Sequence, residues 1–188
     1  MYSLFLKDKT VSLVGNGVHQ ESRVVDVLAH VNRSTEQTDV MYHALDIIDT
    51  IPPVKWIVAT LPETDHKFLV MKRGWRGAKM ERFLELYKPG FGVEFRVVEE
   101  GPFIAATKEM GCCPFSGISA LIDLLQFDIK SVFITGFDFY RELTNPTNHH
   151  IMKSSVWHLP HIQLEWFRKL VQRDSRILVD TYLKELMT

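Results

Sequence analysis

The stretch Thr10–Gly17, TVSLVGNG, contains a short apolar run, Thr10–Val14, that ends in a Gly-Asn-Gly turn. This is the pattern of a buried strand with a turn at its carboxyl end. Similar runs recur along the chain, each bounded by glycine, proline or polar residues. They cover Val24–Val31, Asp39–His43, Val54–Ala59, Val93–Val98, Ser131–Thr135 and Arg176–Val179.

Between these runs, apolar residues recur at the spacing of helices. The segments that we predict to be helical are His66–Val70, Ala78–Lys88, Gly117–Phe127, His161–Gln172 and Thr181–Met187. Nearly continuous apolar strands that alternate with helices indicate an α/β fold with a mostly parallel sheet and helices on both faces. In such sheets ligands bind at the carboxyl ends of the strands, so the residues after each run are the candidate site.

Length and composition limit the classes of protein to which the chain can belong. The chain has 188 residues, 46% hydrophobic and 24% charged, which is typical of one globular domain, here 1–188. Its net charge of −1 argues against a general nucleic-acid-binding protein, which needs a basic surplus. No apolar run is long enough to cross a membrane and no signal peptide is recognisable, so we expect a soluble, cytoplasmic protein.

The two cysteines, Cys112 and Cys113, are adjacent. Neighbouring cysteines rarely form a disulfide with each other, so we expect no disulfide framework. Such a sequence fits a reducing compartment.

The Gly15-Asn16-Gly17 turn would let a ligand approach the backbone closely. Asn16 offers both donors and an acceptor, so it can bind a phosphate or a ribose. The spacing is not the dinucleotide fingerprint, because no third glycine follows at the required position. The alternative is a plain turn in which asparagine and glycine supply positive φ angles.

A second candidate is Pro114–Gly117, PFSG, at the start of a predicted helix. Ser116 stands where an N-cap residue is expected. A helix N-terminus also presents free N–H groups and a partial positive charge to an anion. The alternative is that Ser116 caps the helix and binds no ligand.

A third candidate follows the run Ser131–Thr135, where Gly136 is followed by Phe-Asp-Phe-Tyr. Tyr140 can donate a hydrogen bond to a leaving phosphate, and Asp138 can cap or bond a neighbouring loop. The alternative is an aromatic cluster that seals the edge of the sheet.

Four of the eight histidines fall between His149 and His161. The segment 141–157 before them has no clear period and is predicted to be a short lid or loop. His158 is a candidate general base, because histidine titrates near neutral pH. Zinc binding by His158 and His161 together with His149 and His150 is an alternative, but no acidic or thiol partner has a recognised ligand spacing, so we expect no metal.

Taken in order, these motifs resemble those of the sialyltransferases. LVGNG, VDVLAHVNR, TDVMYHA, PFSG, ITGFDFY and a histidine before the last amphipathic helix are similar to bacterial glycosyltransferase family 42 and, more distantly, to the sialyl motifs of family 29. The similarity spans Val11 to Val179. It implies a Rossmann-like single domain, the sialyltransferase-like GT-A variant, that transfers sialic acid from CMP-sialic acid with inversion and no essential metal.

The resemblance also implies roles for single residues. Asn16 and Asn32 match nucleotide-contacting asparagines, and Ser116–Gly117 matches the helix start that holds the donor. Tyr140 matches the tyrosine that hydrogen-bonds the departing phosphate, and His158 matches the base that deprotonates the acceptor hydroxyl. The predicted site is therefore a catalytic pair, His158 and Tyr140, and a nucleotide-binding set, Gly15, Asn16, Gly17, Asn32, Ser116, Gly117 and Asp138.

The resulting hypothesis is a metal-independent, inverting glycosyltransferase with a CMP-sugar donor, a glycan acceptor and no cofactor. Family 42 carries a second lid tyrosine, which the stretch after Tyr140 lacks, and His43 stands where that family tends to have asparagine. These departures favour the alternative, a catalytically degenerate nucleotide-binding protein that acts as an interaction module. A metal-assisted hydrolase built on the histidine cluster is a third hypothesis, and homo-oligomerisation is left open.

Overall fold

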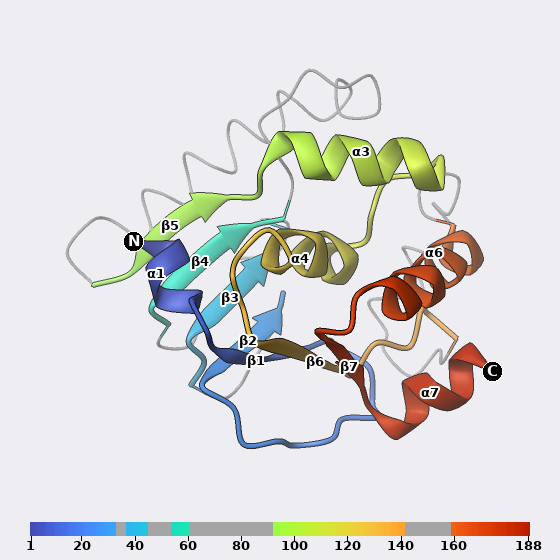
Figure 1. Cartoon of the computed structure of the whole chain (residues 1–188), viewed down its shortest axis with the longest axis horizontal. Helices are drawn as coiled ribbons and strands as arrows, with labels where there is room; N and C mark the ends of the chain where they lie inside the picture. The colour runs from blue at the N-terminus through green and yellow to red at the C-terminus, as the bar shows by residue number, and fades with distance from the viewer. Residues whose placement is uncertain (33–36, 45–53, 61–91, 142–158) are drawn as a thin grey trace.

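Seven parallel strands form the sheet of this α/β domain (Figure 1). The computed structural model describes residues 1–32, 37–44, 54–60, 92–141 and 159–188. The order across the sheet is β5-β4-β3-β2-β1-β6-β7, and every neighbouring pair is parallel. The strands are Thr10–Val14 (β1), Val27–Val31 (β2), Val40–His43 (β3), Trp56–Ala59 (β4), Glu94–Val97 (β5), Ser131–Thr135 (β6) and Ile177–Val179 (β7).

Each predicted run contains one strand, and β1 and β6 agree with their predictions to the residue. The run Val24–Val31 was predicted to be strand throughout, and its beginning is wrong. Val24 is 104% exposed, and pairing with β1 starts at Val27. The reason is that β1 begins at Thr10, whose backbone and hydroxyl bind the Asp26 carboxylate, so residues before Asp26 have no strand beside them.

The described helices are Tyr2–Leu6 (α1), Glu100–Met110 (α3), Ser116–Leu124 (α4), Pro160–Arg173 (α6) and Thr181–Met187 (α7). The last three were predicted, with ends that differ by a few residues for α4 and α6. The sequence analysis missed α1 and α3. Gly101 and Pro102 in the first turn of α3 read as a loop, although proline is tolerated there. The predicted helices 66–70 and 78–88, and nearly all of the predicted lid 141–157, lie outside the described residues.

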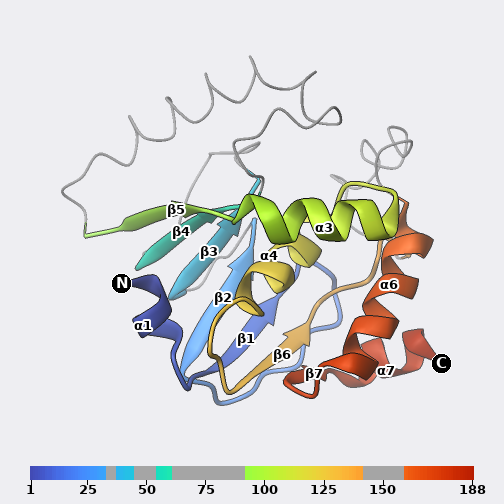
Figure 2. The same ribbon diagram turned by 45° about the horizontal axis from the view of Figure 1, so that its top comes forward.

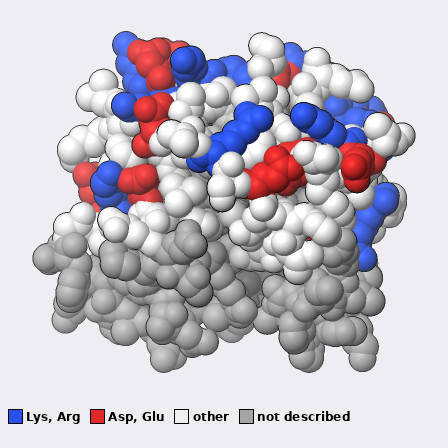
Figure 3. Space-filling view, turned by 90° about the horizontal axis from the view of Figure 1, so that it is seen from below, with Lys and Arg blue, Asp and Glu red and all other residues white. Residues whose placement is uncertain are grey.

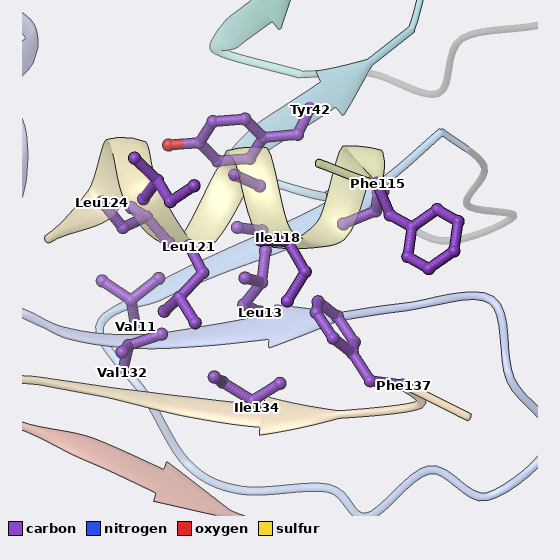
Figure 4. Packing of buried hydrophobic residues seen from close by; sticks show 14 of the residues in the cluster. Val11, Leu13, Tyr42, Phe115, Ile118, Leu121, Leu124, Val132, Ile134 and Phe137 are labelled. Carbon is purple, nitrogen blue, oxygen red and sulfur yellow. The ribbon is translucent and has the colours of Figure 1, made fainter. Parts of the chain in front are cut away.

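The main core lies between the sheet and helices α3, α4 and α6 (Figure 2). Alternate strand residues point to this face, and Figure 4 shows Val11, Leu13, Val132 and Ile134 directed toward α4. Ile118, Leu121 and Leu124 of α4 are at most 1% exposed against them. The α/β, Rossmann-like single-domain prediction is thus confirmed. Across the described part of the chain, no helix is long and apolar enough to cross a membrane.

The order of the strands reverses at β1. Strands β2 to β5 extend to one side of it, and β6 returns to its other side, with Val14 opposite Thr135. In open parallel sheets, the carboxyl ends of the two strands at such a reversal diverge and leave a crevice. The topology therefore directs the search for a site to the residues that follow β1 and β6.

Candidate functional site

A pocket lies at this reversal. Its volume is about 560 Å³, which includes space open to solvent. It is lined by the turns after β1, β2 and β6 and by the start of α4. The lining residues are Gly15, Asn16, Gly17, Val31, Asn32, Phe115, Ser116, Gly117, Ile118, Gly136, Phe137, Asp138, Phe139 and Tyr140.

The pocket brings together most of the residues that we predicted from the sequence. The whole nucleotide-binding set and Tyr140 line it, although they come from segments more than a hundred positions apart in the chain. Their roles in binding and catalysis stay predictions. The predicted base, His158, lies outside the described residues, as do His149 and His150.

Gly15 and Gly17 are required by close packing of two backbone turns. The N–H of Gly15 donates to Thr135 O, and that of Gly17 to Gly136 O, each at 2.8 Å. A Cβ atom on Gly15 would lie 2.3 Å from Gly136 O, and one on Gly17 would lie 2.8 Å from the same atom. Neither glycine has a positive φ angle, so the alternative of a turn that needs positive φ at these glycines is wrong. The turn leaves Asn16 exposed at its tip.

Asn32 follows β2 in the left-handed region, with φ of 63°. Its N–H donates to Tyr42 O at 2.7 Å, and its Oδ1 accepts from Ala44 N–H at 2.9 Å. The carboxamide oxygen is thus engaged by the neighbouring strand end. The Nδ2 group is the part of Asn32 that can reach a ligand, so this residue would act as a donor.

The start of α4 lies one residue earlier than predicted. Phe115 occupies the N-cap position, and Ser116 is the first helical residue, so the expectation that Ser116 is the N-cap is wrong. No side chain caps this N-terminus and its first turn has no acidic residue. Backbone N–H groups of the first turn and the positive end of the helix dipole therefore lie at the pocket with no carboxylate from the helix itself, which suits an anion.

Gln163 of α6 holds the segment that leads into α4, and sequence analysis missed it. Its side chain is fully buried. Its Oε1 accepts from Phe115 N–H at 2.8 Å, and its Nε2 donates to Cys113 O at 3.0 Å. The feature that could have indicated it in the sequence is a glutamine between Ile162 and Leu164, on the side of the helix that faces the core.

Tyr140 and Phe139 have φ angles of 58° and 49°, which non-glycine residues adopt at a cost. Asp138 stabilises the turn, because its Oδ1 accepts from Tyr140 N–H at 2.9 Å. The Tyr140 ring lies 4.6 Å from that of Phe115, centroid to centroid. Burial, and secondarily the Asp138 carboxylate, raises the pKa of Tyr140 to about 12. The phenol therefore keeps its proton at neutral pH and remains a donor.

The aromatic residues of this segment divide between core and pocket. Phe137 and Phe139 are buried, and Phe139 packs against Phe167 with ring centroids 5.4 Å apart. These phenylalanines therefore pack into the core, and they follow β6, which lies inside the sheet and not at its edge. Tyr140 is half-buried and lines the pocket.

The lining carries no lysine or arginine among the described residues, and Asp138 is its one acidic group. The described residues hold no cluster of three His, Cys, Asp or Glu side chains that could bind a metal ion. Cys112 is buried, which raises the pKa of its thiol. The described lining thus presents neutral hydrogen-bonding groups, one helix N-terminus and the Asp138 carboxylate.

The comparisons with known proteins add to this geometry. No protein-family model matches the chain, and neither does a curated protein. The structure of the sialyltransferase CstII from Campylobacter jejuni, in complex with the substrate analogue CMP-3FNeuAc, is similar with a TM-score of 0.51 at 10% sequence identity. The alignment covers 91% of this chain and 78% of that one. The chain has a sialyltransferase-like fold.

Proposed function

We propose that this chain is a glycosyltransferase with a CMP-activated sugar as donor, that it transfers sialic acid to a glycan hydroxyl with inversion, and that it needs no metal. One observation carries the proposal. The pocket at the strand-order reversal joins an uncapped helix N-terminus, two asparagines and a protonated tyrosine. A solved structure of the same fold type was determined with a CMP-sugar analogue.

The charge of the pocket supports a monophosphate-linked donor. The diphosphate of a sugar linked to a nucleoside diphosphate carries more negative charge than the single phosphate of a CMP-sugar, and enzymes usually offset a diphosphate with lysine, arginine or a metal ion. The described lining has no lysine or arginine. A helix N-terminus contributes about half a positive charge, which together with neutral donors suits a singly charged phosphodiester.

The chemistry needs a base and a stabilised leaving group. In the proposed reaction the bond from the anomeric carbon to the CMP phosphate oxygen breaks, and its electron pair leaves with the phosphate. Tyr140 donates its O–H hydrogen bond to that oxygen. The acceptor oxygen attacks the opposite face of the sugar, and its proton passes to His158.

Surface charge gives no support to a nucleic-acid partner. On the face shown in Figure 3, lysine and arginine are interspersed with aspartate and glutamate over the described residues. A protein that binds the phosphate backbone presents a continuous basic surface.

The first test is binding of CMP, UDP and GDP, measured by calorimetry in EDTA. We expect CMP to bind, and UDP and GDP to bind at least tenfold more weakly. Absence of CMP binding would overturn the proposed function.

The second test is release of CMP from CMP-sialic acid with and without glycan acceptors. We expect acceptor-dependent release that His158→Ala abolishes and that His161→Ala, a change at an exposed histidine of α6, leaves unaltered. CMP binding without release would support the degenerate nucleotide-binding alternative instead.

A further inference from the structure

The segment 19–21 connects the Gly15–Gly17 turn to the C-terminal helix. Nε2 of Gln20 donates to Gly15 O and to Gly17 O, both at 3.1 Å. Because a carboxamide nitrogen has two N–H groups, both of its donors are used on this one turn. The side chain also lies across Gly136, where a Cβ atom would be 3.1 Å from Gln20 Cγ.

Residues on both sides of Gln20 are anchored. The His19 ring stacks on the Tyr182 ring of α7, with centroids 4.3 Å apart. Glu21 N–H donates to Thr135 Oγ1 at 2.8 Å, and the Glu21 carboxylate accepts from Thr181 N–H at 2.8 Å. The backbone of Gln20 is thus fixed by β6 on one side and by α7 on the other.

The helix α7 is in turn joined to the pocket by its N-cap. The buried Asp180 carboxylate accepts from Leu183 N–H at 2.7 Å and from Gly136 N–H at 3.3 Å. The start of α7, the Gly136 turn and the Gly15–Gly17 turn therefore hold one another through hydrogen bonds.

The bond of Gln20 to Gly15 O fixes the direction of the peptide group before Asn16, and its bond to Gly17 O fixes that of the peptide group after Gly17. The peptide group between Asn16 and Gly17 is held by the bond from Gly17 N–H to Gly136 O. A trans peptide is planar, so its N–H points opposite to its C=O. When Gly15 O is held by Gln20, the N–H of Asn16 is held in the opposite direction. Gln20 itself is exposed, so these bonds contribute little to the core and act on the conformation of the turn.

We propose that Gln20 is a positioning residue for nucleotide binding, because its carboxamide, anchored through segment 19–21 on α7, fixes the turn that presents Asn16 to the donor. This inference rests on the proposed function. A flexible turn would have to be ordered at the moment of binding, and that entropy is lost from the affinity. When Gln20 holds the turn, this entropy is already lost on folding and does not weaken nucleotide binding.

The test replaces Gln20 by methionine, which has a similar length and no donor. We expect CMP to bind about tenfold more weakly, because the turn must then be ordered on binding, while the thermal midpoint changes little because Gln20 is exposed. The matched control is Gln126→Met. Nε2 of Gln126 also donates to a backbone carbonyl, Ile122 O at 3.0 Å, but Gln126 does not line the pocket. The control should retain its CMP affinity.

Hydrogen exchange of the Gly17 amide, which donates to Gly136 O, gives a second readout without nucleotide. We expect faster exchange in Gln20→Met than in Gln126→Met. Unchanged CMP affinity in Gln20→Met would overturn the inference, and so would equal exchange rates in the two variants. If the unaltered protein binds no CMP, the proposed function fails and Gln20 loses its nucleotide role, even where exchange shows that it orders the turn.

Discussion

Tyr140 is the residue whose chemistry the structure constrains most closely. Its pKa is raised to about 12, first by burial and then by Asp138, so the O–H form persists through the range where an exposed tyrosine would ionise near pH 10. The stability that this group contributes is complete below pH 10 and is lost as the pH rises through 12. Tyr140 can therefore donate a hydrogen bond across the whole physiological pH range.

Replacement of Tyr140 by phenylalanine removes this donor and keeps the ring against Phe115. We expect CMP release from CMP-sialic acid to slow by about 10²–10³-fold, the usual effect of losing one hydrogen-bond donor to developing charge. CMP affinity should change less than tenfold, because the bond strengthens as the phosphate leaves. Steady-state kinetics and calorimetry measure the two effects separately. An unaltered rate would remove Tyr140 from the mechanism.

The glycines of the pocket allow a second test at the level of one residue. Gly15→Ala would place a methyl group 2.3 Å from Gly136 O, so we expect it to lower the free energy of unfolding by about 2–4 kcal/mol, as for overpacked cores. Gly101→Ala is the control. It meets nothing within 4 Å in the first turn of α3 and should stabilise by about 0.5–1 kcal/mol. Urea denaturation measures both, and equal stabilities of the two variants would contradict the packing argument.

Site residues within a recognisable sequence motif could be predicted from the sequence. Residues whose partners are distant in the sequence could not. Asn16, Asn32 and Tyr140 each follow an apolar run, and the rule that ligands bind at strand ends is enough to select them. Gln20 and Gln163 lie outside any motif. Their partners are backbone groups that only the fold brings near, and backbone groups leave no trace in the sequence pattern.

At the level of elements, Gln163 joins α6 to the start of α4. In Gln163→Glu, the ionised carboxylate would face Cys113 O and lose the donor, whereas the protonated acid could donate as the amide does. Burial raises the pKa of such a group. We therefore expect Gln163→Glu to be destabilised at pH 7 by about 2–3 kcal/mol, and this loss to shrink as the pH falls toward 5.

Urea denaturation at several pH values tests this expectation, with Gln172→Glu as the control on the exposed surface of the same helix. The control should show no comparable recovery at acid pH. If Gln163→Glu were as stable as the unaltered chain at pH 7, the bond to Cys113 O would not be needed for the start of α4.

Strands were more predictable than helices for a physical reason. A strand buried on both faces is mainly apolar, so β1 and β6, each followed by a glycine, could be predicted to the residue. Helix α3 buries Phe103, Ala106, Thr107 and Met110. Its buried face includes a threonine and an alanine, so the sequence shows only a weak amphipathic pattern. Packing against α4 and α6 stabilises the helix instead. The five-residue helix α1 likewise depends on packing, because Tyr2 and Leu6 are buried in the core.

At the level of the whole molecule, the order of the strands determines where a site can form. Because β6 returns beside β1, the turns that follow these strands meet although they are far apart in the sequence. The start of α4 closes the same crevice from above the sheet (Figure 4). The sequence could predict the strands and their helices, whereas the adjacency of β1 and β6 is a property of the fold.

A buried polar network connects helices and strands on the β5 side of β1. Tyr42 OH donates to Asp123 Oδ2 at 2.8 Å, and Tyr2 OH lies 2.9 Å from Tyr42 OH. Arg96 of β5 forms an ion pair with Asp123 of α4 at 2.5 Å. Although burial disfavours its charge, the Asp123 carboxylate raises the pKa of Arg96. The network joins α1, β3, β5 and α4.

Removal of the arginine should show how much the whole domain depends on this network. Arg96→Met leaves a buried carboxylate without its counter-ion, so we expect the free energy of unfolding to fall by about 3–5 kcal/mol at pH 7. Arg173→Met breaks an exposed pair with Glu109 and should cost less than about 1 kcal/mol. Asp123 can be protonated in acid, so the deficit of Arg96→Met should shrink as the pH falls toward 4. A deficit equal to that of Arg173→Met in urea denaturation would mean that packing around Tyr2 and Tyr42, and not the ion pair, joins α1 and β5 to the domain.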